Sequence, residues 1–568
     1  MFKRLPYGNS NFGKVIEENF CYIDKTRYIE LLENESNSYQ FFIRPRKFGK
    51  SLFFSTLLHY YDLNRAGDFE KLFGNLYIGK NPTPRKNSYM VMRFNFSGIN
   101  TASEDDFKVS FFQNVQDTVL LFIESYSNLI PNADDLIQKI NEEKRGINAL
   151  RVAYGAAESA GIKIYVLIDE YDHFANDLIA MGSQLGDGVY RRVTRANGLV
   201  RDFYETLKIG TSDVLDRIFI TGISPVMLDD LTSGFNIAAN LSLKLAYNEM
   251  MGFTQEEVDA MMKATGVNPE HIIVDMAMYY DGYLFHEDGK RRVYNPSMVL
   301  YFFNQVLDEK KPPKNIIDDN LKTDYGRIQR LVQNEENREQ LLAVAKENGI
   351  ASNIISKFSI DRMEDTEYFI SLLFYMGLLT IDKFEKGRTL LKIPNYSIQT
   401  IYWEYIERLT RDVNERVVFN LINLNDAIVD LAYRGNLVSY VDYVSQNVFS
   451  RLSNRDLVRF DEKYIKIMLL NELFQSRLYV PVSEMEVENG YIDIWLERSP
   501  LLPDIRYEWA WEVKYLKKED EGQLPAKKEE ALAQLEKYRR SDRFKDRTDV
   551  RYAALLFTGK DHYEIAEL

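Results

Sequence analysis

Four short apolar runs, separated by helical stretches, constrain the fold of this chain more than any other feature. They lie between Tyr39 and Leu245, at residues 39–43, 89–94, 164–168 and 217–221. Largely apolar strands suit a sheet that is buried on both faces, and strands that alternate with helices predict a parallel sheet. The N-terminal part of the chain, residues 1–245, is therefore predicted to be an α/β domain.

The pattern becomes helical after Leu245. Thr254 and Glu257 have the spacing of a capping box, and residues 246–315 are predicted to form a helical lid. A lysine- and proline-rich linker at residues 309–314 leads to a mostly helical middle region, residues 316–450. A helix at 367–376 and two strands at 378–384 and 389–393 fit either a winged helix or a generic helix–hairpin unit.

Residues 451–568 are predicted to form a small α/β domain. Helices are expected at 461–474 and 526–540, and strands near 479–486, 491–497, 507–515 and 550–557. The chain of 568 residues is long enough for three to four domains at ~150 residues each.

Composition excludes several classes of protein. The single cysteine, Cys21, excludes an internal disulfide framework and a zinc site built from several cysteines, and favours a reducing compartment. The net charge of −14 argues against a basic coat for nucleic acid but leaves room for a local basic cleft. No signal peptide or apolar run of ~18 residues is present, so a cytoplasmic location without a membrane partner is expected.

A phosphate-binding loop is predicted where the first strand meets a helix. The sequence from Arg44 to Ser51 ends in Gly49-Lys50-Ser51 and runs into an apolar helix start. In such a loop, backbone N–H groups surround phosphates, the lysine reaches the β and γ oxygens and the serine hydroxyl binds Mg²⁺. Arg44 stands where the pattern has its first glycine, so a basic strand-to-helix turn is the alternative.

An acidic pair at the end of the strand 164–168 strengthens the nucleotide interpretation. Asp169 would face Mg²⁺ and Glu170 would orient the attacking water. The alternative for this pair is a capped helix start. The strand that ends at Thr221 is expected beside it, with Thr221 or Ser224 as a candidate sensor of the γ-phosphate.

A second acidic constellation lies near the C-terminus. Asp493 is in one predicted strand, and Glu512 and Lys514 share one face of the next. On neighbouring strands, the two carboxylates can share a hard cation while Lys514 lies beside the attacking water or the scissile phosphate. A solvated cross-strand salt bridge is the alternative.

Three helical residues extend this constellation. Glu462 on the preceding helix adds a third carboxylate, and Gln534 and Tyr538 are four residues apart on one face of the following helix. Taken singly, each of the three also fits an ordinary helix surface.

These residues resemble a known family, the bacterial AAA-ATPase-like proteins that carry a C-terminal PD-(D/E)XK nuclease domain. The resemblance covers nearly the whole chain and rests on a series of short motifs in a fixed order. Besides the phosphate loop, they are Tyr22-Ile23-Asp24-Lys25-Thr26, Asp169-Glu170-Tyr171-Asp172, Phe219-Ile220-Thr221-Gly222, Gly252-Phe253-Thr254, Tyr280-Asp281-Gly282-Tyr283, Tyr294-Asn295-Pro296 and Lys392-Ile393-Pro394-Asn395.

The resemblance implies a P-loop NTPase sheet with a helical lid, a helical middle region and a restriction-endonuclease-like domain at 451–568. Arg-Pro-Arg is usual at the start of the family's loop, which adds Arg46 to the nucleotide-binding residues. Asp493, Glu512 and Lys514 correspond to the nuclease core, Glu462 to the helical acidic residue, and Gln534 with Tyr538 to the accessory helix motif. Tyr491 departs from the family, which has an arginine there.

The sequence thus predicts an ATP-binding protein with a Mg²⁺-dependent nuclease domain, with Mn²⁺ as an alternative metal. Nucleic acid, with DNA as the expected form, would be hydrolysed under ATPase control. Homo-oligomerisation is left open. The alternative is a STAND-like signalling or scaffold ATPase whose C-terminal domain binds a partner or nucleic acid without cutting it.

Overall fold

The computed structural model describes residues 2–143, 146–180, 186–194, 198–227, 235–318, 328–332, 334–358, 362, 365–413, 421–451, 461–474, 476–488, 490–559 and 562–568. The chain forms two compact units. Unit 1 comprises residues 1–344 and 349–397, and unit 2 comprises residues 345–348 and 398–568. The middle region expected at 316–450 is therefore divided between the two units.

A parallel five-stranded sheet forms the centre of unit 1. Four of its strands correspond to the predicted apolar runs, and the short strand at residues 239–240 was not predicted. The strand order is β2-β3-β4-β1-β5. The strands are β1 (Tyr39–Ile43), β2 (Met90–Asn95), β3 (Ile164–Asp169), β4 (Leu215–Gly222) and β5 (Ala239–Asn240). Because β4 pairs with both β1 and β3, the strand that ends at the phosphate loop and the strand that ends at the acidic pair flank the end of β4.

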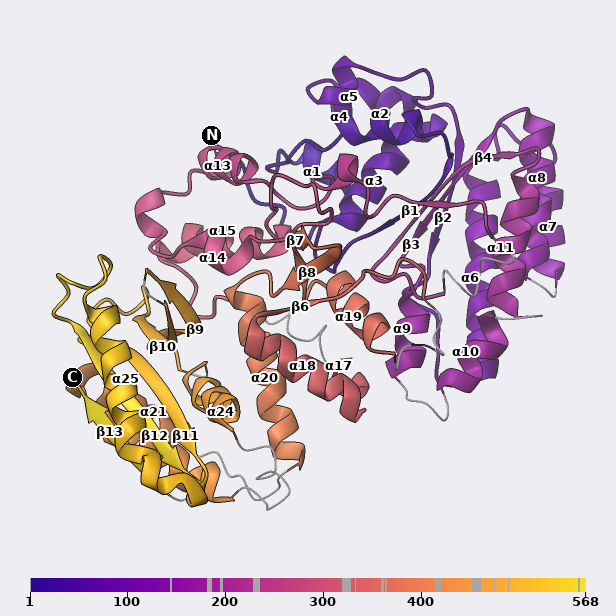
Figure 1. Cartoon of the computed structure of the whole chain (residues 1–568). Coiled ribbons are helices and arrows are strands. Elements are labelled where there is room, and N and C mark those ends of the chain that lie inside the picture. The colour runs from indigo at the N-terminus through magenta and orange to yellow at the C-terminus, as the bar shows by residue number, and fades with distance from the viewer. Residues whose placement is uncertain are drawn as a thin grey trace. The chain divides into compact units, whose positions relative to one another are not determined.

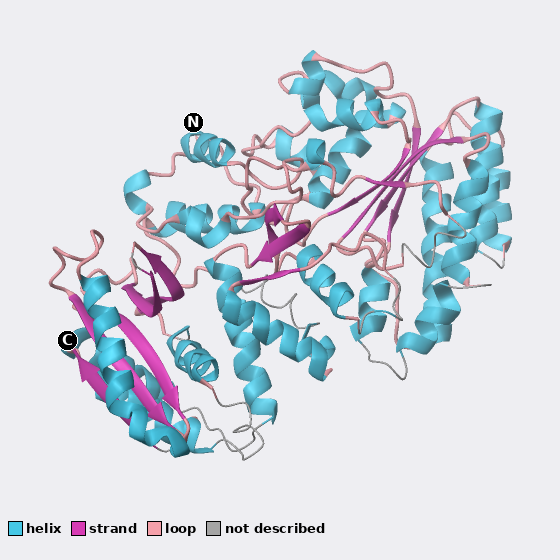
Figure 2. Ribbon diagram, in the orientation of Figure 1, coloured by secondary structure: helices cyan, strands magenta, loops and turns pink. Residues whose placement is uncertain are grey.

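Helices cover both faces of this sheet (Figures 1 and 2). The first group follows the N-terminus and β1, and the second connects β2 to β3 and β3 to β4. Crossovers that run in opposite directions along a parallel sheet place their helices on opposite faces. The helices are α1 (Phe12–Glu17), α2 (Arg27–Asn34), α3 (Lys50–Tyr61), α4 (Phe69–Phe73) and α5 (Tyr77–Lys80) in the first group, and α6 (Glu104–Ser125), α7 (Ala133–Glu142), α8 (Gly146–Ala160), α9 (His173–Ala180), α10 (Gly186–Thr194) and α11 (Leu199–Gly210) in the second.

The expected lid segment is helical and belongs to unit 1. It contains α13 (Gln255–Thr265), α14 (Met276–Tyr280) and α15 (Pro296–Glu309). The Thr254 side chain accepts from the backbone N–H of Glu257, and the Glu257 carboxylate accepts from the N–H of Thr254, so the predicted capping box is confirmed.

The rest of unit 1 contains a small three-stranded sheet. Its order is β6-β8-β7, with β6 (Gly349–Ala351), β7 (Thr380–Glu385) and β8 (Arg388–Lys392). The helices around it are α17 (Ile328–Leu331), α18 (Glu335–Glu347) and α19 (Thr366–Tyr375). The predicted helix and hairpin are present, and β6 is an additional strand. The winged-helix interpretation stays a prediction.

Unit 2 is built on a mixed five-stranded sheet of order β13-β12-β11-β10-β9. The strands are β9 (Tyr479–Val487), β10 (Gly490–Arg498), β11 (Glu508–Leu516), β12 (Val550–Thr558) and β13 (His562–Glu567). The helices are α20 (Tyr396–Val413), α21 (Leu421–Val429), α22 (Leu437–Asn447), α24 (Glu462–Phe474) and α25 (Leu524–Arg539). Only the edge strand β13 was not expected from the sequence.

Hydrogen bonds attach the helices before α24 to the sheet domain. The Tyr440 hydroxyl donates to the Leu469 carbonyl over 2.6 Å, and the Trp509 indole donates to the Leu431 carbonyl over 3.3 Å. These contacts extend unit 2 well before residue 451. Among the described residues, no helix combines the length and the apolar character that crossing a membrane requires.

The four tryptophans give unit 2 its own fluorescent reporter, because Trp403, Trp495, Trp509 and Trp511 all lie in it. Leu535 on α25 is fully buried in the core of unit 2, and Leu57 on α3 is fully buried in unit 1. We predict that Leu535→Ala destabilises unit 2 by about 3 kcal/mol through the cavity it leaves. Denaturant unfolding followed by tryptophan fluorescence measures this loss. The matched variant Leu57→Ala is expected to leave this transition in place, and an equal shift would show that the two units unfold as one.

Candidate functional site

The phosphate loop joins β1 to α3 through a backbone that needs left-handed conformations. Gly49, which precedes the first residue of α3, has a φ of +89°, and Lys47 has a φ of +66°. Space does not explain the glycine, because an added Cβ at Gly49 would meet no atom within 4 Å. The positive φ explains the glycine, because residues with a Cβ adopt the left-handed conformation at a cost of ~1–2 kcal/mol.

Lys50 folds back onto its own loop. Its ammonium donates to the carbonyls of Arg44 and Pro45 over 2.9 and 2.8 Å. Burial lowers the pKa of Lys50 to about 8, although the nearby carboxylates of Asp169 and Asp172 oppose this effect. The lysine can therefore exchange two neutral acceptors for a charged phosphate, which is the stronger partner.

Arg44, at the position of the missing first glycine, braces the loop from behind. Its guanidinium lies 3.9 Å from the ring centroid of Phe285 and donates to the carbonyls of Ser242 and Tyr247 over 2.7 and 2.8 Å. Burial lowers the pKa of Arg44 to about 9. The Arg44 side chain is thus buried in the interior of the fold, and the Arg44 backbone carbonyl accepts a hydrogen bond from Lys50.

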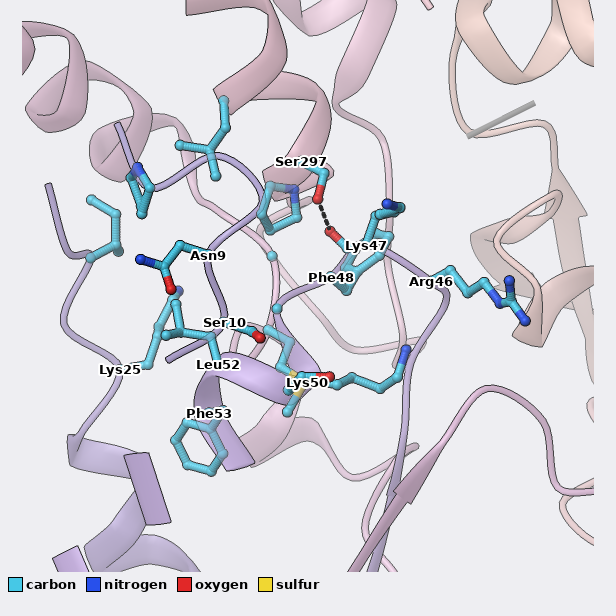
Figure 3. A pocket seen from close by; sticks show the side chains of 18 of the residues that line it. Asn9, Ser10, Lys25, Arg46, Lys47, Phe48, Lys50, Leu52, Phe53 and Ser297 are labelled. Atoms are coloured by element: carbon cyan, nitrogen blue, oxygen red, sulfur yellow. Dashed lines mark hydrogen bonds between the residues drawn. The ribbon is translucent and has the colours of Figure 1, made fainter. Parts of the chain in front are cut away.

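A cavity of about 670 Å³ opens in front of the loop (Figure 3). Four distant segments complete its wall beside the loop residues 46–53. They are Pro6 to Ser10, Cys21 to Lys25 without Asp24, Met250 to Phe253, and Pro296, Ser297 and Leu300. The Ser297 hydroxyl donates to the Lys47 carbonyl over 3.1 Å and so ties α15 to the loop.

The predicted acidic pair lies beside the loop. Asp169 is buried at the end of β3, and burial raises its pKa, while a hydrogen bond from Ser51 and the charge of Lys50 lower it. Glu170 lines the cavity with a φ of +51°, and its carboxylate lies 3.4 Å from Nδ1 of His173. Ser51, Asp169 and Glu170 thus meet as the sequence predicts. A buried carboxylate with a hydroxyl partner fits a cation bound with a nucleotide.

Thr221 and Asp172, two polar residues near the acidic pair, are held by hydrogen bonds within the fold. The buried Thr221 hydroxyl donates to the Phe42 carbonyl over 2.8 Å, while Ile223, two residues on, lines the cavity. Asp172 accepts from the backbone N–H groups of Ile223 and Ser224 and from the Ser224 hydroxyl. These bonds fix the turn after β4. Arg46 lines the cavity as predicted, and Figure 3 places its side chain on the opposite side from Asn9.

Sequence reasoning from chemistry missed most of the cavity wall. Lys25 lies in this wall with its ammonium 2.7 Å from the Glu257 carboxylate, which itself belongs to the capping box of α13. The motifs around Tyr22, Gly252 and Pro296 were visible in the sequence only through the family resemblance. The structure brings residues of these three motifs together in the wall of one cavity.

In unit 2 the predicted acidic residues lie on paired strands. β10 and β11 are antiparallel with Ile494 opposite Trp511, which brings Asp493 beside Glu512. One oxygen of Asp493 accepts from the backbone N–H of Val513 over 2.8 Å. Glu512 is only 2% exposed, and Lys514 donates to one of its oxygens over 2.8 Å. The other Glu512 oxygen is buried and has no hydrogen-bond partner among the described residues.

Charges around Glu512 shift its pKa. Burial raises the pKa of Glu512, the Asp493 charge raises it further, and Lys514 opposes both. Burial also raises the pKa of Glu462, with Lys514 and Lys466 acting against it. An orphaned buried oxygen next to a second carboxylate fits a hard divalent cation. Within the described ranges, however, no three acidic or histidine side chains form a group that could hold a metal ion.

Two lysines, Lys466 and Lys514, lie among these acids. Lys466, which the sequence did not single out, contacts Asp493 with its ammonium, lies 2.9 Å from Glu484 and 3.9 Å from Glu462. A signal existed in its position four residues after Glu462 on α24, the spacing of one helix face.

Of the two accessory residues on α25, Tyr538 contacts the strand that carries Asp493. The Tyr538 hydroxyl donates to the Tyr491 carbonyl over 2.8 Å, and the amide oxygen of Gln534 is buried without a partner among the described residues. The Tyr491 side chain is half exposed. Tyr491 therefore adds no buried charge at the position where the family that this chain resembles has an arginine.

Comparisons with known proteins agree with this division of the chain. Residues 6–232 match a family described as predicted AAA-ATPase, and residues 460–567 match the PD-(D/E)XK nuclease superfamily. A protein of Azotobacter chroococcum mcd 1, described as an uncharacterized protein in the vnfD 5′ region, is 27% identical over 312 residues. That alignment covers 53% of this chain and 52% of the relative, so the chain spans about half the length of this curated relative.

Two solved structures have low similarity to the model. The Walker-type ATPase PABY2304 of Pyrococcus abyssi is 13% identical with a TM-score of 0.38, over 70% of this chain and 98% of its own. The Orc1 protein of Aeropyrum pernix, solved in complex with DNA, is 9% identical with a TM-score of 0.24, over 68% of this chain and 95% of its own. The family matches and the two sheets agree: this chain joins an AAA-ATPase-like domain in its N-terminal part to a PD-(D/E)XK nuclease-superfamily domain in its C-terminal part.

Proposed function

We propose that this protein binds ATP in unit 1 and hydrolyses phosphodiester bonds of nucleic acid in unit 2, with DNA as the expected substrate. The observation that carries the nuclease proposal is the buried oxygen of Glu512 that has no partner in the described part of the chain and lies beside Asp493 and Lys514. Leaving a carboxylate oxygen buried without a partner costs stability, so a site that retains one is suited to a cationic ligand.

Each residue of the nuclease site has a role in this proposal. Asp493 and Glu512 would hold Mg²⁺ or Mn²⁺. Glu462, which forms no three-acid group with them among the described residues, would have to move to become a third acidic ligand. The metal, when bound, lowers the pKa of water and neutralises phosphate charge. Lys514 stabilises charge on the scissile phosphate, and Gln534 and Tyr538 line the approach from α25.

The ATP site divides its work similarly. The N–H groups of the loop and Lys50 bind the phosphates, with Gly49 allowing the turn and Arg46 at the rim. Ser51 and Asp169 would hold Mg²⁺ bound with the nucleotide. Glu170 orients the attacking water, and Thr221 remains a proposed sensor that would first have to leave the Phe42 carbonyl.

Contacts behind the loop support control of the nuclease by ATP. Phe48 packs edge-on against Tyr283 at 4.9 Å between ring centroids, and Gly377 abuts Pro45, where an added Cβ would lie 2.9 Å away. The Thr380 hydroxyl bonds the backbone of Leu284 over 2.7 Å. A shift of the loop would therefore reach the β7–β8 hairpin, which precedes the helix α20 that leads into unit 2.

One observation favours the alternative function, a STAND-like scaffold whose C-terminal domain binds without cutting. Carboxylates gathered without a metal would repel each other. Here Lys466 and Lys514 pair with Asp493 and Glu512, so the cluster is tolerable as a purely structural network.

We predict that Glu512→Gln abolishes metal-dependent cleavage, with a loss of at least about 100-fold, because even outer-shell changes cost metal sites 10–100-fold. Cleavage of linear DNA, circular DNA and RNA by purified protein with Mg²⁺ or Mn²⁺ measures this loss. Glu486→Gln is the matched control, since Glu486 is exposed on β9 of the same sheet. Absence of cleavage by the wild type with every substrate and metal would favour the scaffold.

We predict that Lys50→Met weakens ATP binding at least tenfold, because a charged hydrogen bond contributes about 1.5–3 kcal/mol. Titration with a fluorescent ATP analogue measures the affinity, and Lys80→Met, an exposed lysine outside the cavity, serves as the control.

The same variant tests control by ATP. Wild-type cleavage is expected to change when ATP is added, whereas cleavage by Lys50→Met is expected to be the same with and without ATP. An unchanged ATP response in Lys50→Met would refute nucleotide control through this loop.

A further inference from the structure

Lys466 occupies the centre of the carboxylate cluster of unit 2. It is only 9% exposed, and its ammonium bridges Asp493 and Glu484. Although burial alone would lower the pKa of Lys466, the two carboxylates raise it, so the side chain is charged at neutral pH. A buried cation therefore already holds the oxygen of Asp493 that is not bonded to Val513.

The second partner, Glu484, is held in a strained conformation. Its φ is +52° in the middle of β9, where a residue with a side chain costs ~1–3 kcal/mol. The pairing of β9 with β10 is interrupted here, because Ile492 pairs with Met485 and Ile494 with Ser483, but no pair is formed between Asp493 and Glu484. The Glu484 carboxylate lies 2.9 Å from the ammonium of Lys466, and the Glu484 side chain is half exposed.

Space is available beside the bridge. Lys466 and Glu484 line a cavity of about 40 Å³ together with Lys463, Ser483 and Trp403, whereas Asp493 does not line it. A cavity of that size holds a water molecule, and an ammonium group is of similar size. The lysine can thus move away from Asp493 and still keep Glu484 as its counter-ion.

We propose that Lys466 is a built-in competitor for the metal, a positioning residue that holds Asp493 in the metal-free protein and withdraws to Glu484 when a divalent cation binds. This inference rests on the proposed function, since it assumes that Asp493 is a metal ligand. The lysine lowers metal affinity and keeps the two carboxylates from repelling each other while the site is free of metal. Glu484 makes the exchange possible, because it prevents a displaced lysine from being left buried without a partner.

Mn²⁺ affinity, measured by calorimetry on the full chain, tests the proposal without any cleavage assay. Lys466→Met is expected to bind Mn²⁺ about tenfold more tightly than the wild type, because a charged competitor has been removed. Lys537→Met is the control, since Lys537 is an exposed lysine of α25 and does not line the cavity. Unchanged or weaker binding by Lys466→Met, or equal tightening by Lys537→Met, overturns the proposal.

Glu484→Gln provides a second variant that leaves the buried lysine in place. It is expected to weaken Mn²⁺ binding in the wild-type background and to have no effect together with Lys466→Met. Equal weakening in both backgrounds would refute the exchange. If Lys466→Met does not fold without metal, tryptophan fluorescence of unit 2 with Mn²⁺ replaces calorimetry, and recovery of the folded signal supports the proposal. If the signal does not recover, the single variants Glu484→Gln and Lys466→Gln decide. Lys466→Gln is expected to bind Mn²⁺ more tightly than the wild type.

The outcomes separate this inference from the proposed function. Mn²⁺ binding by the wild type with no gain in Lys466→Met overturns the inference and leaves the metal site standing. Binding by Lys466→Met alone supports the inference in its strongest form. Binding by neither protein refutes both.

Discussion

A carboxylate buried at a strand needs partners that replace water, and both halves of this chain depend on how that need is met. Asp172 is fully supplied by two backbone N–H groups and a hydroxyl, so it stabilises a turn and has little capacity left for a ligand. Glu512 keeps one buried oxygen without a partner among the described residues. The difference in hydrogen-bond satisfaction separates an acid that stabilises the fold from an acid that is available for chemistry.

The buried lysines of the two sites likewise need partners that replace water. Lys50 bonds to two carbonyls of its own loop, and Lys466 bridges two carboxylates. In each case an internal acceptor holds the ammonium before a ligand arrives. Neutral carbonyls compete weakly with a phosphate, whereas a carboxylate competes strongly with a metal ion. ATP binding should therefore meet little internal opposition, and metal binding in unit 2 should meet more.

The sequence predicted what local pattern and chain order determine. The four apolar runs became strands of unit 1, and the strands predicted to carry Asp493 and Glu512 formed in unit 2, because strands follow from periodicity. The structure shows that these last two strands are neighbours, which the sequence left as a condition of the site. The role of Arg44 could not be predicted, since it depends on partners brought close only by the fold. For Lys466, the helical spacing indicated Glu462 as a neighbour, but its contacts with Asp493 and Glu484 also depend on the fold. The same holds for the cavity wall: the segment around Gly252 carries no chemistry of its own and gains meaning only beside the loop.

The loop's packing also limits how nucleotide binding can be transmitted. Arg44 cannot move without losing bonds to Ser242 and Tyr247 and its stacking on Phe285, so the rear of the loop is fixed. Phe48 and Pro45 instead face an aromatic and glycine surface formed by Tyr283 and Gly377. Aromatic contacts can slide at lower cost than buried hydrogen bonds can break. Phosphate binding would therefore be transmitted mainly through these two residues to the hairpin that precedes α20.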